Sequence, residues 1–163
     1  LIVTGVQTCA LPIFLEESIS HYLSLSNYVT IAGDFNARTR DLCDYCQFDE
    51  HLIEELDIDI PDLNATLRPQ TILEHLHLPL ERISEDKDKS NNFGSRLIDM
   101  CKNLNMFICN GRIGRDKCVG TTTCKDTSVI DYVISSPVVL SLFKDFEIQE
   151  FSPLFSDVHC PLF

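Results

Sequence analysis

The stretch VTIAGDFN, residues 29–36, carries the fold prediction. Tyr28–Ala32 is short and rich in β-branched and aromatic side chains, which is typical of a strand covered on both faces. Gly33 allows the chain to turn where that strand ends. Because side chains of an extended chain point alternately to its two sides, we expect Asp34 and Asn36 to lie on one side. The pattern predicts a buried strand that delivers a carboxylate and an amide, although an ordinary turn after a strand has the same composition.

Two amphipathic helices are expected to pack on the sheet. Apolar side chains recur at spacings of three and four from Phe14 to Leu25. A second pattern of this kind runs from Phe93 to Leu104, and Asn91 or Asn92 can cap its start. Each helix would therefore turn one apolar face toward the strands.

Further segments have the pattern of regular structure. Met106–Cys109 and Val129–Ile134 are apolar and β-branched, whereas apolar and polar residues alternate over Phe146–Phe151. A short helix is expected over Val138–Phe143. Strands separated by amphipathic helices are typical of layered proteins. We therefore predict an α/β fold, with the strand that ends near Gly33 at the centre of its sheet.

The composition fits one folded domain and limits its partners. The chain has 163 residues, 44% of them hydrophobic, and its apolar runs are far shorter than the ~20 residues of a membrane span. We expect no transmembrane helix and no membrane partner. The formal net charge is -12, whereas affinity for nucleic acid comes largely from Lys and Arg that neutralise phosphates. The charge therefore argues against tight DNA binding by this chain alone.

Residues 1–13 are predicted to be a non-native leader. Val3–Ile13 looks like the conceptual translation of a sequencing-adapter oligonucleotide. A signal peptide is the competing interpretation, but the stretch has no initiator Met and no basic first region, and Gln7 and Pro12 interrupt its apolar residues. We therefore expect a domain over residues 14–163 whose natural sequence continues upstream.

A long acidic loop is predicted at about residues 37–90. Residues 41–62 contain nine acidic side chains and no Lys or Arg, which favours a solvated, irregular segment. Residues 61–89 contain three prolines and end in a run of charges, so we expect an exposed excursion of low order. Cys43 and Cys46 form a Cys-x-x-Cys pair, but the chain has no second pair at short spacing, and zinc is therefore not favoured.

Two polar residues near the end of the chain are candidates for a site. Asp131 interrupts a β-branched run, and a buried carboxylate is costly unless it is paired. An imidazole would be an economical partner, because carboxylates orient histidines in catalytic sites. An exposed strand face would explain the position of Asp131 equally well. His159 follows Asp157 by two residues, and an aspartate so placed can hold a cation or activate water.

Five basic residues lie between Lys102 and Lys125, which reverses the local sign of the charge. Arg112, Arg115 and Lys117 belong to this group and are candidates for contacts with substrate phosphate. A solvated turn would account for them equally well.

Three motifs follow one another in the order GDFN (33–36), SVIDYV (128–133) and SDVHCP (156–161). Together they resemble the C-terminal half of the endonuclease/exonuclease/phosphatase superfamily, especially the apurinic-type endonuclease domains of non-long-terminal-repeat retrotransposons. The resemblance spans roughly residues 14–163. The commonest family pattern has the last Asp and His adjacent, whereas Val158 separates Asp157 from His159 here.

The resemblance implies a partial four-layer α/β sandwich, with mixed sheets flanked by helices and the N-terminal half missing. It also implies a metal-dependent phosphodiesterase mechanism with Mg²⁺, or alternatively Mn²⁺. Asp34 would position or deprotonate the attacking water, and Asn36 would help to hold the phosphate. Asp131 would orient His159, which would stabilise charge on the phosphoryl oxygens. Asp157 would lie near the metal.

The resemblance further implies nucleic acid, in particular DNA, as the substrate of the parent protein. The family's main metal ligand, a Glu, belongs to a strand upstream of these motifs, so this chain alone is expected to be inactive. A downstream reverse transcriptase domain would fit the retrotransposon pattern, as would nuclear localisation; the eight scattered cysteines favour reduced thiols in an intracellular compartment. Two alternatives stay open, a non-catalytic remnant or binding module, and a phosphatase of the same superfamily that acts on small phosphate esters.

Overall fold

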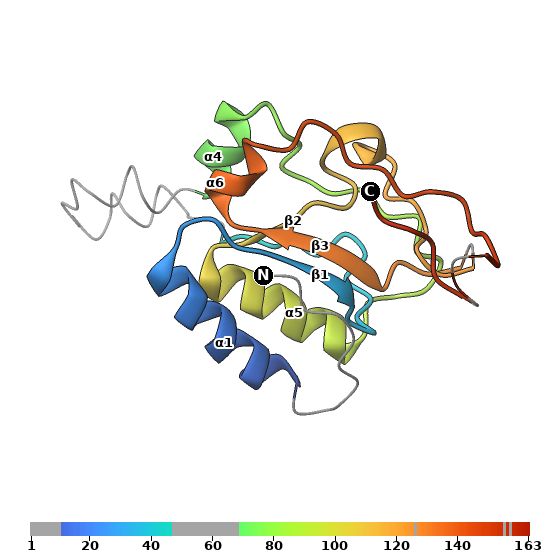
Figure 1. Ribbon diagram of the computed structural model, residues 1–163, viewed down its shortest axis with the longest axis horizontal. Helices are drawn as coiled ribbons and strands as arrows, with labels where there is room; N and C mark the ends of the chain where they lie inside the picture. The colour runs from blue at the N-terminus through green and yellow to red at the C-terminus, as the bar shows by residue number, and fades with distance from the viewer. Residues whose placement is uncertain (1–10, 47–68, 126, 155, 157) are drawn as a thin grey trace.

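A computed structural model describes residues 11–46, 69–125, 127–154, 156 and 158–163 (Figure 1). The described elements are, in chain order, α1 (Leu11–Leu25), β1 (Thr30–Asp34), α4 (Pro69–His75), α5 (Asn92–Leu104), β2 (Phe107–Ile108), the 3-10 turn η1 (Gly114–Asp116), β3 (Asp131–Ser135) and α6 (Pro137–Leu140). Helices and a three-stranded antiparallel sheet are thus combined in one mixed α/β structure. In the described part of the chain, no helix is long and apolar enough to cross a membrane.

The sheet has the order β1-β3-β2, so the prediction that the strand ending near Gly33 is central is wrong for the described strands. The central strand is β3, all five of whose residues are buried, whereas Ile31 is the one buried residue of β1. A strand with neighbours on both edges and layers on both faces is buried along its length, and the apolar residues Tyr132–Ile134 of β3 suit that place, whereas Asp131 and Ser135 at its ends are buried with polar partners. Both pairings are antiparallel, so the described strands form no mixed sheet.

Each face of the sheet carries its own apolar core, because neighbouring residues of a strand point to opposite faces. Ile134 and Ile108 belong to the core between the sheet and helices α1 and α5, and Val133 and Phe107 belong to the core on the other face. Figure 1 shows α1 and α5 side by side under the sheet, with α4, α6 and long irregular segments above it. The sheet is therefore a middle layer.

The helices confirm the sequence patterns. Asn91 caps α5, and its Oδ1 accepts a hydrogen bond from the backbone N–H of Gly94 at 2.8 Å. α1 ends at Leu25 as predicted but begins at Leu11, within the stretch assigned to the leader. The segment Phe146–Phe151 is not a regular strand, and contributes one isolated bridge between Ile148 and Leu162.

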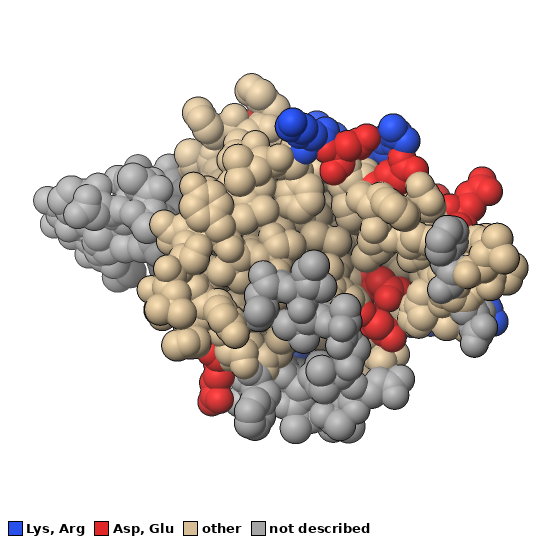
Figure 2. Space-filling model, viewed as in Figure 1, with Lys and Arg blue, Asp and Glu red and all other residues tan. Residues whose placement is uncertain are grey.

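The second half of the predicted acidic loop is partly exposed, as expected, but it contains a helix and buries several side chains. Helix α4 buries Leu73, and the segment that follows buries Arg82 and Asp86. Arg82 is tied to the loop after β1, since its Nη2 donates to the carbonyl of Leu42 at 2.9 Å. Residues 47–68 of the predicted loop lie outside the described residues. Lys and Arg are sparse on the face in Figure 2, in keeping with the net charge of -12.

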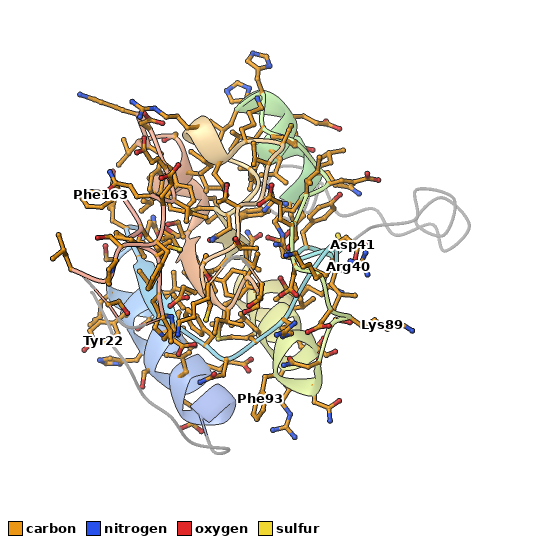
Figure 3. The ribbon with its side chains drawn as sticks, turned by 90° about the vertical axis from the view of Figure 1, so that its right-hand side faces the viewer. Tyr22, Arg40, Asp41, Lys89, Phe93 and Phe163 are labelled. Atoms are coloured by element: carbon orange, nitrogen blue, oxygen red, sulfur yellow. The ribbon has the colours of Figure 1, made fainter. Side chains whose placement is uncertain are left out.

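Figure 3 shows how this packing arranges the surface. Arg40, Asp41 and Lys89 project from one side of the molecule, and Tyr22 and Phe163 lie toward the opposite side. The loop after β1 and the segment before α5 therefore share one side, as the bond between the Arg38 carbonyl and the Asn91 N–H, 3.1 Å, also requires.

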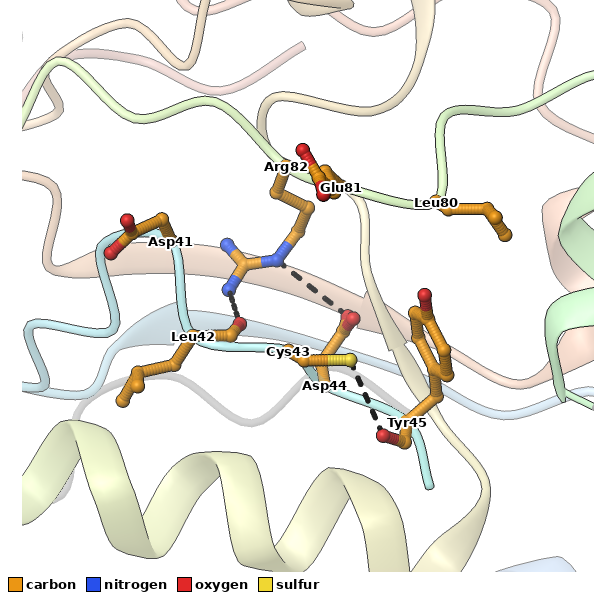
Figure 4. A pocket seen from close by; sticks show the side chains of 8 residues that line it. All are labelled: Asp41, Leu42, Cys43, Asp44, Tyr45, Leu80, Glu81 and Arg82. Carbon is orange, nitrogen blue, oxygen red and sulfur yellow. Dashed lines mark hydrogen bonds and ion pairs between the residues drawn. The ribbon is translucent and has the colours of Figure 1, made fainter. Parts of the chain in front are cut away.

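A buried ion network holds these irregular segments on the sheet. The guanidinium of Arg112, which is 0% exposed, donates to both carboxylate oxygens of Asp44 at 2.7 and 2.9 Å. Arg82 Nε lies 3.7 Å from Asp44 Oδ2 (Figure 4). Burial by itself raises the pKa of Asp44. The charge and hydrogen bonds of Arg112, with other nearby groups, outweigh this effect, so the net shift of the pKa is downward. Asp44 is therefore ionised and buried, and it holds the loop after β1 against Arg112. The acidic pattern of residues 41–62 had predicted a solvated side chain here.

We expect Asp44→Asn to lower the free energy of unfolding by about 3 kcal/mol or more, because two buried guanidinium groups lose their counter-charge. Urea denaturation at neutral pH measures the change. The matched control is Asp99→Asn on the exposed face of α5, which should stay within about 0.5 kcal/mol of the parent. Equal stability of the two variants would contradict the anchoring role.

Candidate active site

The register of β1 and β3 places two carboxylates side by side. Asp34 is the Cα partner of Asp131. The Phe35 N–H donates to the carbonyl of Ile130 at 3.0 Å, so Asp34 and Asp131 form the adjacent pair without mutual backbone bonds. In an antiparallel ladder such pairs bring their side chains closest together. Two residues that are far apart in sequence therefore project from neighbouring strands onto one face.

That face is the one opposite α1 and α5. Ala32 and Val133, two residues from Asp34 and Asp131 along their strands, pack in the core with Leu73. By the two-residue period of a strand the carboxylates point to the same side. The site thus lies at the end of β1 and the beginning of β3, beyond the apolar residues that anchor both strands.

His159 joins this pair from the end of the chain. Cys160 N–H donates to the carbonyl of Thr123 at 2.8 Å, and His159 forms an antiparallel bridge with Cys124. His159 Nδ1 then lies 3.0 Å from Asp131 Oδ2, and Nε2 lies 3.8 Å from Asp34 Oδ2. The family resemblance predicts that Asp34, Asn36, Asp131 and His159 cluster at one end of the sheet, and the structure brings three of them, Asp34, Asp131 and His159, into one group.

The short contact sets the chemistry of the imidazole. An ionised carboxylate only accepts hydrogen bonds, so an ionised Asp131 fixes the proton on His159 Nδ1 and leaves Nε2 toward Asp34. The 3.8 Å separation of Nε2 from Asp34 Oδ2 exceeds a hydrogen bond. The His159 side chain is 33% exposed, so Nε2 stays accessible to a substrate oxygen or an ion.

Asn36 lies beside the site but not as predicted. Its backbone has a φ of 49°, in the left-handed region, and its N–H donates to Asp34 Oδ1 at 2.8 Å. The expectation of an extended chain with Asp34 and Asn36 on one side is therefore wrong, because the aspartate side chain folds the next residues into a turn. Asn36 is exposed, and Asn91 Nδ2 donates to its carbonyl at 3.3 Å.

Thr123 is a residue of the site that the sequence patterns missed. Its Oγ1 accepts from the backbone N–H groups of Ile130 and Asp131, both at 3.0 Å. Its hydroxyl also bonds the Asp131 carboxylate. A threonine in a run of three has no local signal for such a role; only the pairing of residues 123 and 128 across the preceding turn brings it there.

Asp131 is electrostatically perturbed. Burial raises the pKa of Asp131, hydrogen bonds from His159 and Thr123 lower it, and the charge of Asp34 raises it; the net direction is up. Perturbed carboxyl groups that face a histidine are common at functional sites. The pKa direction therefore agrees with the geometry.

The three side chains have a donor set that suits a divalent cation. One ligand atom each from Asp34, Asp131 and His159 lies within 4.8 Å of the others. Carboxylate oxygens suit Mg²⁺ and Mn²⁺, and an added imidazole nitrogen favours Mn²⁺ and later transition metals. Asp157, the predicted metal residue, lies outside the described residues.

The basic residues predicted to contact phosphate have other partners. Arg112 is fully buried on Asp44, which leaves it no surface for a substrate. Its place in an irregular, charged stretch gave no sign of burial. Arg115 forms ion pairs with Asp145 and Glu147. Lys117 Nζ donates to the carbonyl of His77 at 3.0 Å. None of these described contacts reaches the carboxylate pair.

Comparisons with known proteins add no further assignment, because the chain matches no family model, no curated protein and no solved structure. Function is therefore inferred from the site's geometry and from the three motifs.

We expect the stability of Asp131→Asn relative to the parent to increase as pH rises. A carboxyl group whose folded pKa is raised contributes stability that is present below its unfolded pKa of about 3.9 and is lost as pH rises through the folded value. Removing the ionisable group removes that loss. Urea midpoints between about pH 4 and pH 8 measure the difference.

The control for this pH series is Asp99→Asn, whose exposed carboxylate should give no growing difference from the parent. A difference between Asp131→Asn and the parent that stays constant with pH would contradict the electrostatic account of the site.

Proposed function

We propose that this chain belongs to a metal-dependent phosphodiesterase of the endonuclease/exonuclease/phosphatase superfamily that cuts DNA. The observation that carries the proposal is the position of His159, bonded through Nδ1 to Asp131 and open through Nε2 toward Asp34. The three motifs that resemble the superfamily supply these three residues in order. The described sheet with α1 and α5 would form one half of its four-layer sandwich.

The chain's own residues have distinct roles in this proposal. Asp34 accepts a proton from the attacking water or aligns that water for attack in line with the leaving oxygen. His159 acts as an imidazolium, with a hydrogen on both ring nitrogens, and donates through Nε2 to a phosphoryl oxygen, where negative charge builds in the transition state. Asp131 accepts the Nδ1 hydrogen, which orients the ring and stabilises its positive charge. Asn36, exposed at the turn after β1, supplies an amide for the phosphate.

A bound Mg²⁺ or Mn²⁺ would supply Lewis-acid stabilisation of the phosphoryl charge. Asp34 is the carboxylate best placed to share in holding the ion, with Asp157 and an upstream Glu as the further ligands that the family resemblance suggests. Asp131 is committed to His159 by its 3.0 Å bond. Its part is therefore to orient the imidazole.

The DNA partner has to be held despite a net charge of -12. Such a charge weakens the salt-dependent attraction to phosphates, which points to further basic residues elsewhere in the parent protein. A retrotransposon-type polypeptide with a downstream reverse transcriptase, acting in the nucleus, fits that requirement.

The activity test compares this chain with a version extended at its amino end by its own coding sequence. We expect Mg²⁺-dependent nicking of supercoiled plasmid by the extended protein and none by the chain alone, because the family's Glu ligand lies upstream. His159→Ala in the extended protein should lower the rate by roughly 10² to 10⁴, the usual contribution of a proton-donating group.

A small phosphate monoester serves as the parallel substrate, and faster hydrolysis of that ester than of plasmid would favour the phosphatase alternative. Plasmid cleavage that survives His159→Ala would refute the assignment of the site. His21→Ala, on the exposed side of α1, is the matched histidine control.

Metal binding can be tested on the chain as it stands. We expect substoichiometric Mn²⁺ to broaden the NMR signals of the His159 ring selectively, because paramagnetic relaxation falls steeply with distance from the ion. Asp34→Asn should weaken the effect more than Asp99→Asn, since Asp34 Oδ2 faces the open ring nitrogen. Equal broadening of His21 and His159 would contradict a specific site.

A further inference from the structure

Asn110 lies next to the site and is used by no step described so far. It follows β2 directly and is 2% exposed. Its Nδ2 donates to the carbonyl of Asp131 at 3.1 Å, and its Oδ1 accepts from the N–H of Val133 at 3.0 Å. The donor and the acceptor of this one side-chain amide thus both bond to the backbone of β3, on either side of Tyr132.

The reason lies in how β2 ends. Cys109 N–H still donates to the carbonyl of Val133 at 2.8 Å, but the chain then turns away at Gly111, whose φ is 72°. Beyond that point no backbone of β2 remains to pair with β3. The amide of Asn110 has the donor and acceptor of a peptide group, so it continues the ladder by one further step. Without it, two buried backbone groups would lack partners.

The hydrogen bonds from Asn110 and Thr123 fix the backbone of Asp131, the residue that contacts His159. The N–H of Asp131 is held by Thr123 and its carbonyl by Asn110, so both peptide groups that flank its Cα are fixed. On the other edge of β3, the pairing with β1 fixes the distance to Asp34. The Asp131 carboxylate then has little freedom except about its own side-chain torsions, and it meets His159 Nδ1 at 3.0 Å.

We propose that Asn110 is a positioning residue that aims Asp131 at His159. The importance of the aim for catalysis rests on the proposed function, whereas the effect on the hydrogen bond between Asp131 and His159 does not. The donor Nδ2 is the arm that acts on Asp131, and the acceptor Oδ1 is the arm that acts on Val133. The two arms can be separated by one isosteric substitution.

The test is Asn110→Asp in the full chain. When the new carboxyl group is ionised, this change keeps the shape and the acceptor toward Val133 and removes the donor toward Asp131, so the exchange is measured at alkaline pH and compared with Asn110→Ala, which has no donor at any pH. We expect the Nδ1 proton of His159, followed by NMR, to exchange with solvent about tenfold faster than in the parent, as for loss of an ordinary hydrogen bond. The added negative charge would by itself favour the protonated ring and slow exchange, so faster exchange is not a charge effect.

The matched control is Ser136→Ala at the other end of β3. Ser136 is also buried and also bonds backbone, since its Oγ donates to the carbonyl of Asn27 at 2.6 Å and accepts from the N–H of Val29 at 3.2 Å. Its loss should lower the urea midpoint and leave the Nδ1 proton of His159 unchanged. A role of Asn110 in stability alone predicts that both variants behave like this control.

If Asn110→Asp does not fold, the same measurement is made on Asn110→Ala, which also removes the donor but adds no buried charge. Parent-like proton exchange in whichever variant folds would overturn the proposal. An extended protein that cleaves no phosphodiester, together with faster exchange in the variant, would refute the proposed function and leave the positioning role standing. Cleavage with unchanged exchange would do the reverse.

Discussion

The antiparallel register of β1 and β3 is the constraint on which the rest of the structure depends. A slip of one residue would turn Asp34 to the face of α1 and α5 and send Ile31 to the opposite face, so the apolar faces and the carboxylate pair are specified together. The same helices that bury Ile31 and Ile134 therefore also select the alignment that sets Asp34 against Asp131. The same strand register therefore determines both the core packing and the geometry of the candidate site.

Much of the chain around this sheet is irregular, and buried polar side chains take the place of the missing ladders. Asp44 accepts from the N–H of Ile108 at 2.8 Å as well as from Arg112, so one carboxylate serves both a strand and an ion pair. Thr123 and Asn110 likewise hydrogen-bond backbone groups of β3. An irregular segment can pack on a sheet only where its own backbone and that of the strand find partners, and these residues provide them.

Local patterns in the sequence were sufficient for α5, β2 and β3, because amphipathic periodicity, a capping Asn and β-branched runs act within a few residues. The convergence of Asp34, Asp131 and His159 was also predicted, together with Asn36, from the family resemblance that the three motifs carry. The strand order was not, since pairing is decided by contacts remote in sequence. The charge pattern predicted an exposed Arg112, and this was wrong. The burial of an arginine can be predicted only when its buried partner, here Asp44, is known. The roles of Thr123 and Asn110 had no local signal either, because both residues bond to backbone groups of β3 that are not their neighbours in sequence.

The candidate site is held together at an electrostatic cost. Two carboxylates face each other across a strand pair; burial is the main cause of the raised pKa of Asp131, and the charge of Asp34 adds to it. The backbone bonds to Asp131 keep the pair from separating, so the repulsion is relieved either by a proton on Asp131, which its raised pKa favours, or by positive charge from an imidazolium or a bound cation. A phosphoryl group approaching Nε2 brings more negative charge to the same place. Under the proposed function, positive charge at the open side of His159 would stabilise both the folded carboxylate pair and an approaching phosphoryl group, so the strand pairing and the proposed chemistry would need the same charge at the same place.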